Sequence, residues 1–94
     1  MSASPRIMAY RLPLDDDVGM SLPQGAKLLS IQFVPTVQSL MLWAWLDDPM
    51  AALQARYFRI IPTDRPIPET WEALEYLATV QVPGQAVHIF EVHP

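Results

Sequence analysis

The sequence predicts an all-β, mainly antiparallel fold: a small six- to seven-stranded sandwich or barrel with one short helical segment near residues 69–75. Its 94 residues suffice for one core, so we expect a single domain over residues 1–94. Ten prolines against three glycines argue against long helices. Between the turn residues, short runs of β-branched and aromatic residues recur, which is typical of strands. We expect a sandwich rather than a closed barrel.

The first three predicted strands are Ile7–Leu12, Val18–Leu22 and Lys27–Val34. A proline and the acidic run Asp15–Asp17 form the turn after the first strand, and prolines end the other two. In the third strand, Leu29 begins an alternation of apolar with polar residues. Leu29 is therefore expected on the inward face.

The next two predicted strands are Leu40–Leu46 and Gln54–Ile61, separated by an acidic turn that ends in a proline. Three prolines within residues 62–68 then predict a rigid, irregular segment. The helical segment near 69–75 follows, with Thr70 as its expected cap and apolar residues at helical spacing.

Two further predicted strands, Tyr76–Val82 and Val87–Val92, follow the helical segment. The residues between them, Pro83-Gly84-Gln85, fit a type II turn, because proline suits its second position and glycine its third. The twist of such a turn suits a two-residue hairpin poorly, so we expect a slightly longer loop.

Charge and composition argue against several functions. Six basic against ten acidic residues give a formal net charge of −4, so nucleic acid is not an expected partner. The absence of cysteine excludes disulfides, thiolate zinc sites and cysteine nucleophiles. The longest apolar run, Leu40–Leu46, has seven residues, whereas a membrane-spanning helix needs about 20. We therefore expect a soluble, cytoplasmic protein without a membrane partner.

Residues that carry catalysis or hold metals form no recognisable motif. The two histidines, His88 and His93, fall on opposite faces of the last strand, so they are not expected to join as ligands. The acidic clusters lack the spacing of a calcium-binding loop and are typical of solvated turns. No serine lies in a Gly-x-Ser-x-Gly turn. We expect no enzymatic activity, no metal and no cofactor.

The predicted strand Leu40–Leu46 is apolar on both faces. One face holds three leucines and an alanine and belongs to the core, whereas the other holds Met41, Trp43 and Trp45. The second face needs cover by the segment 62–74, by a second copy of the chain or by a foreign protein. Exposed strand edges and an apolar sheet face favour a homodimer.

Tryptophan is enriched at the energetic centres of protein interfaces. We therefore expect a partner-binding surface with apolar anchors at its centre and charged residues at its rim. The anchors are Met41, Trp43 and Trp45, and the rim residues are Asp47, Asp48 and Arg56.

Several stretches share a pattern of turns and core positions with known proteins, namely Tyr10–Leu14, Leu22–Gln32, Leu42–Ala44, Phe58–Ile60, Pro66–Glu69, Tyr76-Leu77 and Val87–Glu91. In these stretches the chain resembles a family of small phage- and prophage-encoded β proteins described as a domain of unknown function. The resemblance covers nearly the whole chain and contains no catalytic signature. It implies a phage or prophage origin and a small β fold.

The resemblance also implies a function. We expect a non-enzymatic accessory protein of the host cytoplasm that binds and sterically inhibits a host protein. The expected partner is a component of antiviral defence, such as a nuclease or a subunit of a defence complex, as for anti-CRISPR proteins. Two alternatives stay open: a virion assembly or structural protein, and a β domain that binds single-stranded nucleic acid through its aromatic residues.

Overall fold

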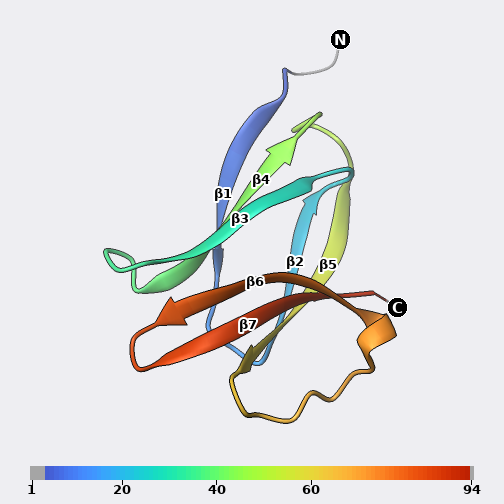
Figure 1. Cartoon of the computed structure of the whole chain (residues 1–94). Helices are drawn as coiled ribbons and strands as arrows, with labels where there is room; N and C mark the ends of the chain where they lie inside the picture. The colour runs from blue at the N-terminus through green and yellow to red at the C-terminus, as the bar shows by residue number, and fades with distance from the viewer. Residues whose placement is uncertain (1–3, 94) are drawn as a thin grey trace.

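The structure, a computed structural model, describes residues 4–93. It contains seven strands in two antiparallel sheets that pack face to face, so the predicted all-β sandwich is confirmed and a closed barrel is not formed (Figure 1). In chain order the elements are β1 (Arg6–Leu12), β2 (Asp17–Pro23), β3 (Lys27–Val34), β4 (Ser39–Leu46), β5 (Leu53–Pro62), η1 (Trp71–Ala73), β6 (Leu74–Val82) and β7 (Gln85–Val92).

The three-stranded sheet has β4 at its centre, with β1 on one side and β3 on the other. β1 pairs with β4 from Arg6, opposite Leu46, to Leu12, opposite Leu40. A central strand is hydrogen-bonded along both edges, and packing against other elements then decides which of its faces are buried. The central place of β4 agrees with a sequence that is apolar on both faces, and the predicted strand is one residue shorter than the observed one.

The four-stranded sheet has the order β2-β5-β7-β6. β6 and β7 form a hairpin in which Val82 is paired with Gln85, so the loop has only two residues, Pro83 and Gly84. The prediction of a longer loop was wrong. Gly84 has a φ of 83°, a conformation that favours glycine, and this positive φ allows the tight reversal after the proline.

The two sheets share one hydrophobic core, which is formed by their inward faces. Its largest fully buried side chains come from both sheets; they are Leu12, Leu22, Leu40, Leu42, Phe58, Val87 and Ile89. Burying side chains of this size contributes on the order of 1.5–3 kcal/mol each, so this core holds the sheets together. β3 and β6 also lie side by side where the sheets meet (Figure 1).

β3 departs from its predicted alternation at a β-bulge. The register against β4 shifts between Leu28 and Ser30, so Leu29 is an extra residue without a partner. Leu29 is therefore 52% exposed, whereas alternation predicts it on the inward face. After the bulge, Ile31 is buried as predicted.

The segment between β5 and β6 packs on the outward face of the four-stranded sheet. Its predicted helix is a single 3-10 turn, η1, and Thr70 precedes it without a side-chain capping hydrogen bond. Arg59 of β5 forms an ion pair with Glu69 of this segment. A second apolar cluster consists of Ile61, Leu74 and Phe90. Within residues 4–93, no helix is long and apolar enough to cross a membrane.

This placement excludes one of the three expected covers for the second face of β4. The segment 62–74 belongs to the four-stranded sheet, and β4 lies in the other sheet (Figure 1). Cover of β4 by this segment therefore does not occur. Trp71, which the segment carries, is 72% exposed.

Candidate protein-binding face

The outward face of the three-stranded sheet carries the predicted anchors and is called the outer face below. Residues directly opposite one another in an antiparallel ladder share a face. By this rule the outer face comprises Met41, Trp43 and Trp45 of β4, Ile7, Ala9 and Arg11 of β1, and Lys27, Ser30 and Gln32 of β3. The leucines and the alanine that alternate with the anchors on β4 are buried, so the predicted alternation is confirmed.

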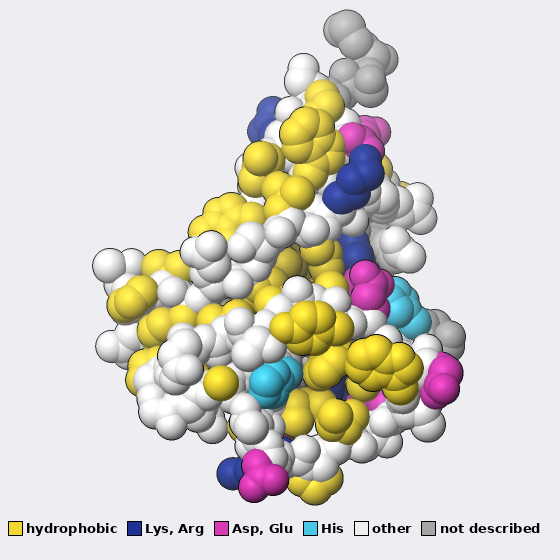
Figure 2. Space-filling model, viewed as in Figure 1, with side chains coloured by type: hydrophobic (Ala, Val, Ile, Leu, Met, Phe, Trp, Pro, Cys, Tyr) yellow, Lys and Arg dark blue, Asp and Glu magenta, His cyan; other side chains and the backbone are white. Residues whose placement is uncertain are grey.

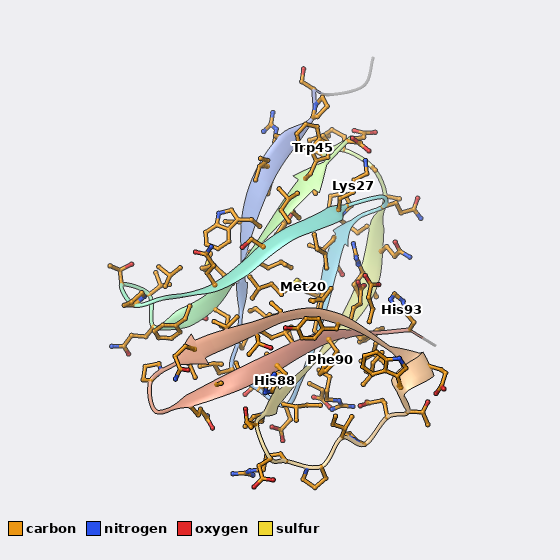
Figure 3. All side chains as sticks on the ribbon, viewed as in Figure 1. Met20, Lys27, Trp45, His88, Phe90 and His93 are labelled. Carbon is orange, nitrogen blue, oxygen red and sulfur yellow. The ribbon has the colours of Figure 1, made fainter. Side chains whose placement is uncertain are left out.

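Large apolar side chains of the outer face remain in contact with solvent. Trp45 is 38% exposed and Ile7 is 54% exposed, and the bulge adds exposed Leu29 to the same sheet. Trp43 and Met41 are half-buried. Figure 2 shows hydrophobic side chains gathered over the end of β1 and β4, where Figure 3 labels Trp45. Contiguous apolar surface with a polar rim is typical of interaction sites.

Asp47 joins this face through two hydrogen bonds. Trp45 Nε1 donates to Asp47 Oδ1 at 2.6 Å, and Lys27 Nζ donates to Asp47 Oδ2 at 2.7 Å. The bond from Lys27, and after it the bond from Trp45, lowers the pKa of the Asp47 carboxyl. Asp47 therefore stays ionised at neutral pH and orients the Trp45 indole. The structure brings Asp47 together with the anchors, and its role in binding stays a prediction.

Asp48 lies in the turn after β4 and has a local structural partner. Its Oδ1 accepts a hydrogen bond from the backbone N of Met50 at 2.9 Å. A short acidic side chain that bonds to the backbone two residues ahead is a common way to fix a turn. Asp48 is half-buried and fixes the turn, and its role at the rim of a binding surface stays a prediction.

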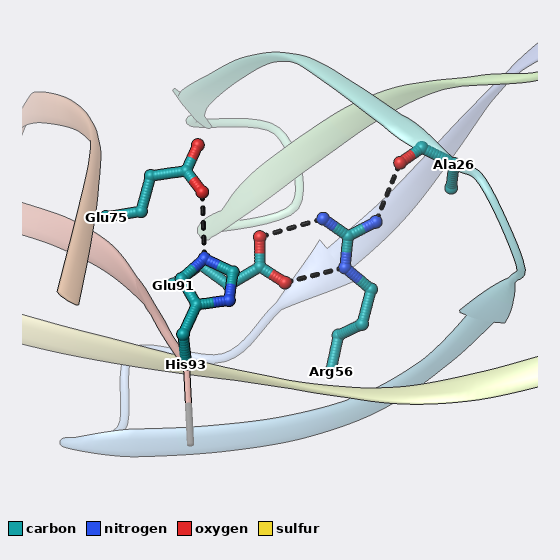
Figure 4. A network of polar contacts seen from close by, with 5 residues as sticks. All are labelled: Ala26, Arg56, Glu75, Glu91 and His93. Atoms are coloured by element: carbon teal, nitrogen blue, oxygen red, sulfur yellow. Dashed lines mark hydrogen bonds and ion pairs between the residues drawn. The ribbon is translucent and has the colours of Figure 1, made fainter. Parts of the chain in front are cut away.

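Arg56 lies on β5 of the other sheet and points inward, so the structure separates it from the anchors. Arg56 Nε and Nη2 donate to Glu91 Oε2 and Oε1 at 2.6 and 2.8 Å, and Nη1 donates to the carbonyl of Ala26 at 2.7 Å (Figure 4). Its side chain is only 17% exposed. The Glu91 carboxylate raises the pKa of the guanidinium above its usual value. Alternation on β5 places Arg56 with Phe58, and this inward position explains its separation from the anchors; its role in binding stays a prediction.

A polar cluster that sequence reasoning missed lies beside this ion pair. Glu75 stands opposite Glu91 across β6 and β7, and His93 Nε2 is bonded to Glu75 Oε1 at 2.8 Å. The backbone N of His93 also donates to the carbonyl of Ala73 at 2.8 Å, so this residue is held by both its backbone and its side chain. The spacing Glu91-x-His93 is the one signal in the sequence, since it places both side chains on the same face of a strand.

Comparison with known proteins gives a family and no activity. No curated protein and no solved structure matches the chain. A family model described as a domain of unknown function matches residues 4–94. The expected resemblance to an uncharacterised domain family is thereby confirmed, and a phage origin stays a prediction. The chain belongs to this family, DUF7352.

Proposed function

We propose that the protein is a non-enzymatic binding protein whose outer face docks on another protein and blocks it sterically. The supporting observation is the exposure of Trp45 and Ile7 beside half-buried Trp43 and Met41 on one sheet face. Apolar surface left in water costs about 25 cal/mol per Å², which a partner surface would offset. Tryptophan is enriched among the residues that contribute most of the binding energy at protein interfaces.

The rim of the outer face favours a protein as the partner. Lys27 and Asp47 form an exposed ion pair beside Trp45, and Arg11 lies opposite Met41 on the same face. An apolar centre surrounded by charges of both signs is the usual anatomy of a protein interface. The charged rim residues guide the two proteins toward each other and fix their relative orientation, whereas the apolar centre contributes most of the affinity.

The partner class follows from the family resemblance rather than from the geometry. A phage-encoded accessory protein acts on the host, so the partner we propose is a host defence protein, such as a nuclease or a subunit of a defence complex. A steric inhibitor of this kind needs a docking face and no catalytic group.

A homodimer is a further part of the proposal. β1 is an edge strand of the three-stranded sheet, and its free edge offers backbone hydrogen-bonding groups to a second copy. Pairing along that edge would leave the outer face open to the host protein. Light scattering on the purified chain measures the oligomeric state directly.

A single-stranded nucleic-acid binder is the second candidate, and one observation favours it. The register places the cations of Arg11 and Lys27 on the same face as Trp43 and Trp45, an arrangement that suits stacked bases with phosphates beside them. The net charge of −4 opposes it. Binding to an oligothymidylate that weakens steeply between about 50 and about 200 mM salt would favour this candidate over the protein-binding one.

The first test is affinity capture from host lysate with the wild-type chain and two matched variants. Trp45→Ser removes the exposed anchor, and Trp71→Ser removes an exposed tryptophan from the other side of the molecule. Both positions are solvent-accessible, so we expect both variants to fold. The proposal predicts one stoichiometric partner that Trp71→Ser retains and Trp45→Ser loses, and whose own activity the wild-type chain inhibits.

Two results would contradict the proposal. Retention of the same partner by Trp45→Ser would place the binding surface elsewhere. Recovery of the chain alone, when the variants and the wild type are equally folded, would contradict the proposal that a host protein is the partner.

A further inference from the structure

Glu75, Glu91 and His93 converge at one end of the four-stranded sheet, away from the outer face (Figure 4). Glu75 of β6 lies directly opposite Glu91 of β7 in the antiparallel ladder. His93 follows Glu91 by two residues and therefore points to the same side of the chain. One donor atom from each of the three side chains lies within 4.8 Å of the others. Strand register thus sets this convergence.

The electrostatics of the cluster favour a cation. Two carboxylates directly opposite each other on neighbouring strands repel, which destabilises a sheet. Arg56 neutralises Glu91 through its two hydrogen bonds, and His93 bonds to Glu75. With a neutral imidazole, the two carboxylates and the one guanidinium leave a net negative charge at the cluster.

Arg56 also fixes one of the donors in place. The Glu91 side chain is only 6% exposed, and the planar guanidinium holds its carboxylate in a bidentate geometry. A carboxylate offers about four lone-pair directions, of which Arg56 uses two, so Glu91 can still accept another ligand. Carboxylates that bind metals are commonly held by a second hydrogen-bonding group of this kind.

A cavity of about 530 Å³ borders the cluster. Glu91, His93 and Arg56 line it, together with Gln54 and Tyr57. Glu75 does not line it, so the cavity leaves room for water beside Glu91 and His93. A set of three protein donors with an open position toward water is the usual form of a reactive zinc site.

We propose that Glu75, Glu91 and His93 bind one divalent transition-metal ion of the zinc class, with Arg56 positioning Glu91 and water completing the coordination. The imidazole nitrogen favours zinc or a similar metal over calcium and magnesium, which take oxygen ligands alone. Zinc bonds to carboxylate oxygen and imidazole nitrogen are about 2.0–2.2 Å long, so the donors must approach to about 3.5 Å of one another. Glu75 and His93 are more than half exposed and can rotate to close this gap.

Zinc binding requires that the donor atoms carry no proton. His93 Nε2 and Glu75 Oε1 now share a hydrogen bond, so one of the two atoms carries the proton between them. If the proton is on Nε2 of a singly protonated ring, it moves to Nδ1 as Nε2 bonds to zinc; if it is on Glu75, or if the ring carries two protons, one proton is released to solvent. Protons and zinc therefore compete for these donor atoms.

The test is a titration of the full chain with Zn²⁺, followed by NMR of the imidazole C–H groups and by calorimetry. The chain has two histidines, so His88 serves as an internal control. His88 lies on the other face of β7, bonded to the hydroxyls of Thr63 and Thr79. The proposal predicts one zinc per chain and a shift of the His93 signals at one equivalent, with the His88 signals unchanged.

Variants separate this site from binding elsewhere on the surface. Glu75→Gln and His93→Gln should each weaken zinc binding at least about 10-fold, whereas His88→Gln should leave it unchanged. Glu75 and His93 are exposed and His88 is half-buried, and circular dichroism without metal checks that each variant folds. No saturable binding at millimolar Zn²⁺, or equal binding by His93→Gln and the wild type, would overturn the proposal. This outcome is independent of the docking test, because the variants leave the outer face intact.

Discussion

Arg56 and Glu91 form the most deeply buried ion pair among residues 4–93. Both charges are satisfied, since the guanidinium also donates to the carbonyl of Ala26. Buried charges persist in a fold only when they are paired and hydrogen-bonded. This one contact therefore ties β5 and β7 to the start of β3.

Replacing Glu91 with Gln should lower the free energy of unfolding by about 3 kcal/mol, because a nearly buried guanidinium loses its counter-charge. Urea denaturation in the presence of a chelator measures the change without any contribution from metal. Glu72→Gln is the control at an exposed acid, and we expect its effect to stay within about 0.5 kcal/mol. Equal midpoints for the two variants would show that the ion pair does not stabilise the fold.

The ion pair of Glu69 with Arg59 should make the free energy of unfolding depend on pH. The Arg59 guanidinium, which bonds to it, lowers the pKa of the Glu69 carboxyl below its ordinary value of 4.5. A depressed folded-state pKa means that the stabilisation is fully present above the unfolded pKa and is lost as the pH falls through the folded pKa. Wild-type stability should therefore fall from about pH 4.5 downward, in the range where carboxyls titrate.

The Glu69→Gln variant isolates this effect. It should be less stable than the wild type at pH 6 and approach the wild type at low pH, because the wild-type carboxyl is then protonated too. Thermal denaturation at a series of pH values measures both curves. If the melting temperatures of the two proteins changed in parallel with pH, the stabilising role assigned to the ionised Glu69 carboxyl would be contradicted.

At the scale of elements, the hairpin between β6 and β7 depends on one backbone angle. Gly84 adopts a φ of 83°, where a Cβ is strained although no other atom crowds it. Gly84→Ala should therefore destabilise the protein by about 1 kcal/mol or more through backbone strain alone. Chemical denaturation measures this loss of stability, and Gln85→Ala, at the next exposed position, is the control. An unchanged midpoint for Gly84→Ala would mean that the turn is not held in this conformation.

The sequence predicted the strands well because alternation and proline positions are local signals. Leu42 and Phe58 fall on the buried faces of the strands that contain them, as the pattern indicates. Leu29 did not follow the pattern, because a bulge depends on the partner strand and leaves no mark in a single sequence. Cover of β4 by the segment 62–74, one of the three expected covers, fails for a similar reason: composition predicts a rigid crossing and does not indicate which sheet it crosses.

The candidate sites were predictable to different degrees. Trp43 and Trp45 were found because two apolar faces on one strand are a local anomaly. Ile7 on the same face, and Arg56 away from it, required the strand register and the assignment of strands to sheets. The cluster of Glu75, Glu91 and His93 combines residues from two strands, and only pairing brings Glu75 to the others.

At the scale of the whole molecule, the outward faces of the two sheets differ in how far the protein's own chain covers them. The four-stranded sheet has a segment of its own chain over part of its outward face, with an ion pair and an apolar cluster beneath, and it leaves Tyr57 and Tyr76 of that face exposed. The three-stranded sheet keeps Trp45 and Ile7 in contact with solvent. This asymmetry is the basis for the proposed docking face.

The affinity of the captured partner for purified Trp45→Ser, compared with Trp71→Ser and the wild type, tests this asymmetry most directly. Removal of a central tryptophan from an interface costs about 2 kcal/mol or more, which corresponds to about a 30-fold rise in Kd. We expect that rise for Trp45→Ser and a wild-type Kd for Trp71→Ser. A wild-type Kd for Trp45→Ser, or an equal loss in both variants, would contradict the assignment of the outer face as the docking surface.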